Sequence, residues 1–140
     1  MGDINNYSYE DIEVGMKETF TVTVTEEMQE SFCRMTGDIN PLHRDAEYAR
    51  SKGYKDRVVY GMLTSSLYST LAGVYLPGVR SLVHSCEAKF LKPVYIGDVL
   101  TVEGKVDEKN DTYSLIRIKA VIRNQDGVKV SKADMQIGLI

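Results

Sequence analysis

Polar side chains of the kinds that carry protons gather in one short stretch of the chain. In residues 36–45, TGDINPLHRD, the carboxylate of Asp38 and the imidazole of His43 lie five residues apart. Pro41 stands between them and disfavours the helical conformation for Asn40, which predicts a stiff loop. A carboxylate and an imidazole in fixed geometry can grip one water molecule, because one takes its proton while the other orients it or delivers a proton elsewhere. Asn40 can fix one of these groups without adding charge.

Other interpretations of the same motif compete with catalysis. Asp, Asn and Pro after a helix often form turns that carry no chemistry. An EF-hand calcium loop is excluded, because the residues after Asn40 lack its glycine and distal glutamate. A metal site through His43 and Asp45 has no second histidine nearby in the sequence, and His84 is more simply a core histidine. We therefore expect neither a metal nor a cofactor.

A second candidate feature lies in residues 58–63, VVYGML, where Gly61 opens a segment without charge. Backbone N–H groups at the start of a helix have no acceptor within the helix and can hold a developing oxyanion. Glycine there would let a substrate carbonyl come close to the backbone. The simpler interpretation is a glycine that only begins a helix. Together, an acid/base pair and an oxyanion donor suit chemistry next to a carbonyl.

The elements that would position these groups follow from the hydrophobic pattern. Residues 17–24, KETFTVTV, alternate apolar side chains with threonine, which is typical of a half-buried strand. Thr25 can cap a helix over residues 26–35, and residues 45–52 indicate a second short helix. Residues 61–76 carry leucines at helical spacing and no charge, so they predict a helix that other elements wrap.

Four antiparallel strands are expected in the rest of the chain. Turns at residues 109–111 and at Asp126-Gly127 predict two hairpins. The apolar phase shifts between Val130 and Ala133, which indicates a bulge or bend. In each of the first three strands, one set of residues is assigned to a single face. The sets are Leu82, Cys86, Ala88 and Phe90 in the first strand, Leu100, Val102 and Val106 in the second, and Ile116, Ile118, Ala120 and Ile122 in the third. This order of elements predicts an α+β fold with a sheet curled round a central helix.

Composition limits the class of protein. A chain of 140 residues is most simply one domain, 1–140, and 43% hydrophobic residues are enough for a core. The net charge of -3 argues against nucleic acid as the main partner, since a phosphate backbone needs a basic face. No apolar run approaches the ~20 residues of a membrane span, so we expect a soluble cytoplasmic protein. Cys33 and Cys86 lack the close spacing of a metal pair and are expected to be buried thiols.

Three stretches of the chain resemble a known family. FCRMTGDINPLHRDAEYA, residues 32–49, closely resembles the signature of the hydratase 2, or MaoC-like, (R)-specific enoyl-CoA hydratases. The resemblance continues through residues 58–67 and 90–102, and so covers most of the chain. It implies the hot-dog fold, in which a curved antiparallel sheet wraps a long central helix. It also implies a homodimer or a dimer of dimers.

The resemblance implies a role for each candidate residue. Asp38 and His43 would be the catalytic pair, with Asn40 in support. The N–H of Gly61 would hold the thioester oxygen, and Ser69 on the central helix would hydrogen-bond the aspartate. The reaction implied is reversible syn hydration of a trans-2-enoyl thioester to an (R)-3-hydroxyacyl thioester. Coenzyme A is the expected carrier, with acyl carrier protein second.

Some features leave alternatives open. Many relatives have histidine or proline where this chain has Tyr60, which changes the expected shape of the pocket. The hot-dog fold also supports a non-catalytic acyl-thioester-binding module, an inert subunit of a heterodimer, and a thioesterase. The last of these normally lacks the Asp-x-Asn-Pro-x-His arrangement. The cationic candidates for the phosphates of the carrier are Lys52, Lys55, Arg57, Arg80, Lys89 and Lys92.

Overall fold

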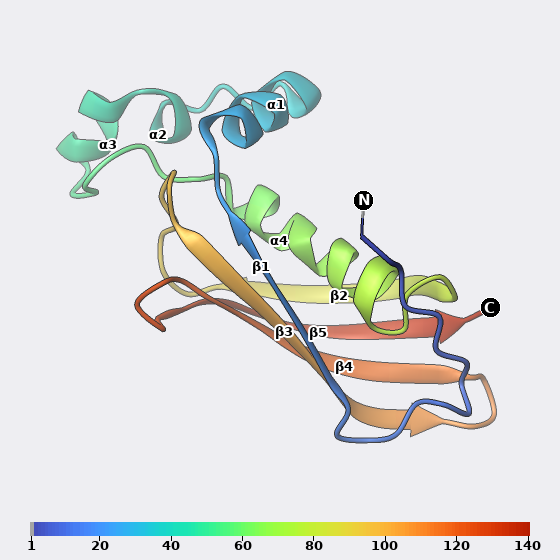
Figure 1. The fold of residues 1–140 in the computed structure, drawn as a ribbon. Helices are drawn as coiled ribbons and strands as arrows, with labels where there is room; N and C mark the ends of the chain where they lie inside the picture. The colour runs from blue at the N-terminus through green and yellow to red at the C-terminus, as the bar shows by residue number, and fades with distance from the viewer. Residues whose placement is uncertain (1) are drawn as a thin grey trace.

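Five antiparallel strands form one curved sheet in the computed structural model, which describes residues 2–140 (Figure 1). The strands lie in the order β1-β3-β4-β5-β2. Their bounds are β1 Lys17–Thr23, β2 Ser81–Phe90, β3 Val99–Asn110, β4 Leu115–Arg123 and β5 Lys129–Leu139. Alternate apolar residues on β3, such as Leu100 and Val102, are fully buried, as the period of a strand requires. The hairpins between β3 and β4 and between β4 and β5 agree with the predicted turns.

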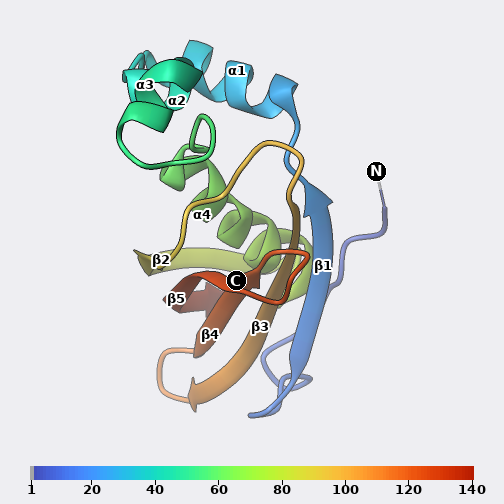
Figure 2. The same ribbon diagram turned by 90° about the vertical axis from the view of Figure 1, so that its left-hand side faces the viewer.

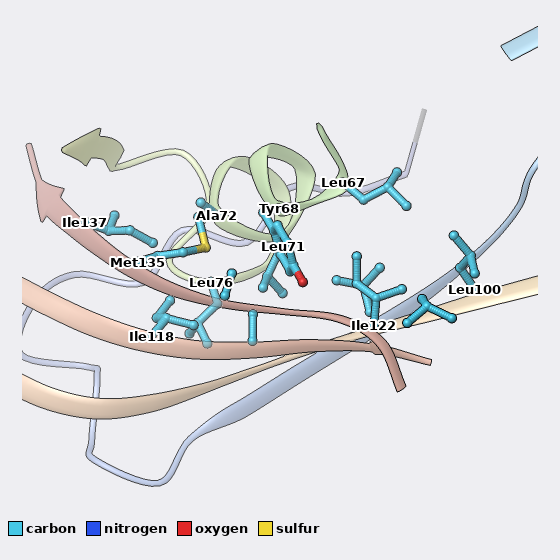
Figure 3. Close-up of a cluster of buried hydrophobic side chains, with 14 of the residues drawn as sticks. Leu67, Tyr68, Leu71, Ala72, Leu76, Leu100, Ile118, Ile122, Met135 and Ile137 are labelled. Carbon is cyan, nitrogen blue, oxygen red and sulfur yellow. The ribbon is translucent and has the colours of Figure 1, made fainter. Parts of the chain in front are cut away.

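One helix lies along the inner side of this sheet (Figures 1 and 2). It comprises α4, Gly61–Thr70, and a π-helical continuation, η1, Leu71–Tyr75. Figure 3 shows its side chains, among them Leu67 and Leu71, facing sheet residues such as Ile118 and Ile122. The uncharged helix predicted for residues 61–76 is therefore confirmed, and so is the α+β class. Burial of these apolar side chains is the main driving force for wrapping the sheet round the helix.

Three shorter helices lie together beyond the end of the sheet where α4 begins (Figures 1 and 2). They are α1, Glu26–Thr36, α2, Pro41–Arg44, and α3, Ala46–Ser51. The Thr25 hydroxyl caps α1 as predicted, since its oxygen accepts a hydrogen bond from the N–H of Met28 at 3.2 Å. Helix α1 ends at Gly37, whose φ of 75° is left-handed and suits glycine.

Strand β2 differs from the prediction because it contains a bulge. Val83 pairs with Ile137 and Ser85 pairs with Gln136, so His84 is an extra residue that reverses the alternation. Leu82 therefore lies on the opposite face from Cys86, and the assignment of both to one face is wrong. The prediction of a core histidine is also wrong, because His84 is exposed and its imidazole lies over Gly138. The bulge predicted in β5 is confirmed at residues 129–131.

The two cysteines have different surroundings. Both are free thiols, and Cys33 on α1 is buried as expected. Cys86 on the edge strand β2 is exposed in this chain, so the expectation of a buried thiol is wrong for Cys86. Within residues 2–140 no helix combines the length and the hydrophobicity needed to cross a bilayer.

Candidate active site

Asp38 lies in the loop between α1 and α2, where local hydrogen bonds fix the backbone. Its N–H donates to the Thr36 hydroxyl at 3.2 Å, and its carboxylate accepts the N–H of Asn40 at 3.1 Å. The Asn40 side chain in turn accepts the N–H of Leu42 at 2.9 Å and so caps α2. The carboxylate of Asp38 is thereby tied to the start of the next helix.

The loop expected across the whole motif is only half correct. Asn40 is extended as predicted, with ψ of 129°, but Pro41 then begins the helical turn α2. Proline suits the first helical position, because its missing N–H would have no acceptor there and its φ is already helical. His43 therefore projects from a capped helical turn and not from a loop.

The imidazole of His43 is held in one tautomer. Its Nδ1 lies 2.7 Å from the carbonyl oxygen of Val58, which can only accept a hydrogen bond. Nδ1 must therefore carry the proton, and in the neutral ring Nε2 keeps a free lone pair. A ring in this state can accept a proton at Nε2 and later return it.

A buried amide holds the segments around His43 together. Gln29 of α1 is fully buried, and its Nε2 donates to the carbonyl oxygens of His43 and Val58, both at 3.2 Å. Its Oε1 accepts the N–H of Tyr60 at 3.3 Å. One side chain thus joins α1, α2 and the strand-like segment before α4. Gln29 does not stand out in the sequence, where the available signal was an uncharged amide one turn before Cys33 on the same helix.

Tyr60 contacts both members of the predicted pair. Its ring stacks on the imidazole of His43, with centroids 4.1 Å apart and planes at 29°. Its hydroxyl donates to the backbone carbonyl of Asp38. Tyr60 is 1% exposed, and burial raises the pKa of its phenol to about 12, so the hydroxyl remains a donor. In the sequence, Tyr60 stood out only because many relatives have histidine or proline at this position.

Gly61 begins α4 beside these groups. The N-cap residue, Tyr60, offers no side-chain acceptor to the first turn, so the N–H groups there stay available. A Cβ at Gly61 would lie 3.3 Å from the ring of Phe90, which is tighter than a normal contact. The close packing of Phe90 therefore favours glycine here, while the backbone itself is helical.

His43 and Gly61 line one pocket of about 250 Å³. Most of its remaining wall is apolar and comes from residues before α4 and from the ends of β2 and β5, namely Val58, Val59, Phe90, Leu91, Pro93, Val94 and Val130. Tyr54, Thr64 and Lys92 complete it. Such a pocket can take an apolar chain and place it beside an imidazole and a helix N-terminus. The Asp38 side chain lies outside this wall and is exposed.

Ser69 does not join the other predicted residues in this chain. It lies in the last turn of α4, about 12 Å along the helix from Gly61 by the ordinary rise of an α-helix. Its side chain is exposed, and within residues 2–140 no hydrogen bond joins it to Asp38. Within the described residues of the single chain, no contact supports the predicted role of Ser69 beside Asp38.

The candidate cations for the phosphates of the carrier lie in different parts of the structure. Only Lys92 borders the pocket. Arg57 is paired with Glu26 at 2.7 Å, and the ammonium groups of Lys52 and Lys55 lie over the rings of Tyr48 and Tyr95. The guanidinium of Arg80 donates to Asn6, and Lys89 lines a separate charged hollow on the sheet.

The fold and site together define a class of protein. A curved antiparallel sheet wrapped round one helix is the hot-dog fold, and His43 of the Asp-x-Asn-Pro-x-His motif shares a pocket with the first residue of that helix. The chain belongs to the MaoC-like domain family, whose family model matches residues 10–132. It is a hydro-lyase.

Two curated relatives and two solved structures illustrate the similarity. The chain is 33% identical over 111 residues to an (R)-specific enoyl-CoA hydratase of Rhodospirillum rubrum, covering 76% of this chain and 77% of the relative. It is 31% identical over 120 residues to the enzyme of that name from Aeromonas caviae, covering 86% and 90%. The unliganded R-hydratase PhaJ1 of Pseudomonas aeruginosa superposes with a TM-score of 0.90 at 33% identity, covering 97% of this chain and 87% of that one. The ChsH1-ChsH2 complex of Mycobacterium tuberculosis superposes with a TM-score of 0.81 at 25% identity, covering 91% and 94%.

Proposed function

We propose that this protein catalyses the reversible syn addition of water to trans-2-enoyl thioesters, giving (R)-3-hydroxyacyl thioesters of coenzyme A. One observation carries the proposal: His43, held with Nε2 free, and Gly61, at the start of α4, line the same largely apolar pocket. The names of the similar hydratases support the substrate class.

The proposed mechanism uses Asp38 and His43 on one water molecule. One of the two takes a proton from the water as its oxygen bonds to C3 of the enoyl chain. Negative charge moves to the thioester oxygen, where the N–H of Gly61 stabilises it. The other group delivers a proton to C2. Delivery of this proton on the face of the chain to which the water adds gives the syn sense, and dehydration follows the same steps in reverse.

The pocket supports this proposal through its chemistry. An apolar wall from Phe90, Leu91 and Val94 suits the acyl chain, and a bound chain would displace water from this wall. Water exclusion strengthens the hydrogen bond to the developing oxyanion, because the local dielectric falls. Lys92 at the border is in a position to meet a phosphate of the carrier.

Crotonyl-CoA distinguishes this function from its alternatives. A hydratase removes the enoyl absorbance without releasing thiol, whereas a thioesterase releases free thiol. A non-catalytic binding module does neither but still binds the thioester in a titration. Loss of enoyl absorbance without thiol release, together with a 3-hydroxybutyryl product of R configuration, is the expected result. Thiol release at a rate equal to the loss of enoyl absorbance would overturn the proposal.

We also propose that the protein is a homodimer. The edge strand β2 exposes Leu82, Val83 and Phe90, which are 51%, 42% and 51% accessible in the single chain. The neighbouring outer face of α4 is uncharged and carries Met62, 64% accessible, with Ser66 and Ser69. An edge strand with unpaired backbone groups and an exposed apolar face can pair with the same surface of a second chain. A second chain would cover the outer face of α4, including Ser69.

A further inference from the structure

Thr64 has a buried hydroxyl without a partner. The residue lies one turn after Gly61 on α4 and is 4% exposed. Among the residues that the structure describes, none hydrogen-bonds its Oγ1. Buried hydroxyls in folded proteins are nearly always paired, so one that stays unpaired calls for an explanation.

Local structure does not satisfy this hydroxyl. A threonine within a helix commonly donates to the carbonyl oxygen one turn back. The carbonyl one turn back, that of Tyr60, accepts the N–H of Thr64 at 3.1 Å but not its hydroxyl. The polar atom is therefore left free.

Thr64 shares the pocket with the proposed machinery. It lines the same pocket as His43 and Gly61. Residues three apart on a helix lie on one face, and a helical side chain leans toward the N-terminus, so Thr64 leans toward Gly61. Among the other residues that line the pocket, the side chains of Val59 and Val130 cannot accept a hydrogen bond. A ligand in the pocket can supply the acceptor that the described residues do not.

We propose that Thr64 donates a second hydrogen bond to the thioester oxygen of the bound substrate, beside the N–H of Gly61. This inference rests on the proposed hydratase function. An oxygen that gains negative charge has lone pairs for two donors, and a donor already fixed in a low-dielectric site needs no reorganisation during the reaction. The hydrocarbon part of the enoyl chain has no acceptor to offer.

A matched set of variants tests the hydroxyl. Thr64→Val keeps the shape and removes the hydroxyl, whereas Thr64→Ser keeps the hydroxyl. We expect Thr64→Val to lower kcat for crotonyl-CoA hydration by roughly 10–100-fold, about the loss of one oxyanion donor or somewhat less. Its Tm should be equal to or above that of the wild type, because an unpaired polar group has been removed from the interior. Thr64→Ser should keep kcat within about threefold of the wild type by the same reasoning.

Thr70→Val, at the far end of α4, is the control and should leave kcat unchanged. A Thr64→Val protein with the kcat of the wild type would overturn the inference while leaving the hydratase function intact. A fall in Tm for Thr64→Val with no change in kcat per folded molecule would assign the hydroxyl to a trapped structural water and overturn it as well. A wild-type chain that does not hydrate crotonyl-CoA would overturn the proposed function and this inference together.

Discussion

The imidazole of His43 is fixed from several directions by residues far away in the sequence. The carbonyl of Val58 sets its tautomer, the ring of Tyr60 stacks on one face, and Gln29 holds its backbone oxygen. A general base works best when its geometry is set before the substrate arrives, because a displacement of about 1 Å can cost 10²-fold in rate. The contacts around His43 therefore fix the geometry that a general base requires.

The predicted catalytic pair is tested by removing each member. Asp38→Asn and His43→Ala should each lower turnover by roughly 10²–10⁴, the usual span for a positioned acid/base group. Because both act on one water, the double variant should cost little more than the worse single one. Circular dichroism and melting curves check that the fold persists. Near-normal rates in either folded variant would remove that residue from the mechanism.

Tyr60→Phe tests whether the phenol positions the pair. The variant keeps the ring that stacks on His43 but loses the hydrogen bond to the Asp38 carbonyl. We expect kcat to fall by roughly tenfold with little change in KM, because the carboxylate loop loses its anchor. Tyr68→Phe is a matched control, since Tyr68 is equally buried on α4 and its hydroxyl pairs with Ser131 in the core.

Both phenylalanine variants lose one buried hydrogen bond and should lose stability by about 1 kcal/mol. Only Tyr60→Phe should lose activity per folded molecule. Equal kcat values in the two variants would mean that Tyr60 serves the fold alone.

At the scale of elements, the start of α4 packs against the end of β2. The ring of Phe90 packs close to Gly61, so the helix begins where an added Cβ would crowd an aromatic side chain. The short helices α1 and α2 cover the same end and carry the motif. The candidate site is thus assembled from four elements, α1, α2, α4 and β2, that meet at the start of α4.

Gly61→Val tests the oxyanion donor. The new side chain should crowd Phe90 and tilt or block the N–H, and the loss of an oxyanion donor typically costs about 3–4 kcal/mol of activation free energy. Turnover should fall steeply, while the shape of the pH–rate profile, which Asp38 and His43 set, stays unchanged. Rates normalised to folded protein are the measurement, with melting curves beside them. A less stable variant with full activity would show that Gly61 only begins the helix.

At the scale of the whole molecule, one edge of the sheet and one face of the helix lack a cover in the single chain. The edge strand β1 at the other side ends in polar threonines, whereas β2 exposes leucine, valine and phenylalanine. An edge with exposed apolar residues is a liability for a monomer. The asymmetry between the two edges favours pairing through β2.

The oligomeric state can be tested with variants that place a charge on each edge of the sheet. Light scattering of the wild type at micromolar concentration should give twice the mass of one chain, or four times for a dimer of dimers. Val83→Lys on β2 should shift the protein toward monomers, because the charge would be buried in the interface. Thr21→Lys on β1, where the side chain is exposed, should leave the mass unchanged. A wild type with the mass of one chain would rule out the dimer.

Features that depend on near neighbours were predictable from the sequence. The alternation in residues 17–24 and the uncharged helical stripe after Gly61 encode local periodicity, which sets the type of each element. The Thr25 cap and the extended Asn40 follow from the chemistry of single residues. The motif at Asp38 and His43 could be identified because its residues lie together in the sequence.

Features that depend on distant pairing were decided only by the tertiary structure. His84 is exposed because the pairing of β2 with β5 leaves one residue over, and register is a property of two strands. Gln29 meets Tyr60, and Tyr60 meets Asp38, across 31 and 22 residues. The unpaired hydroxyl of Thr64 is visible only once every neighbour is in place. Periodicity determines which residues are buried, but the contacts that orient a reactive group arise only when separate elements pack.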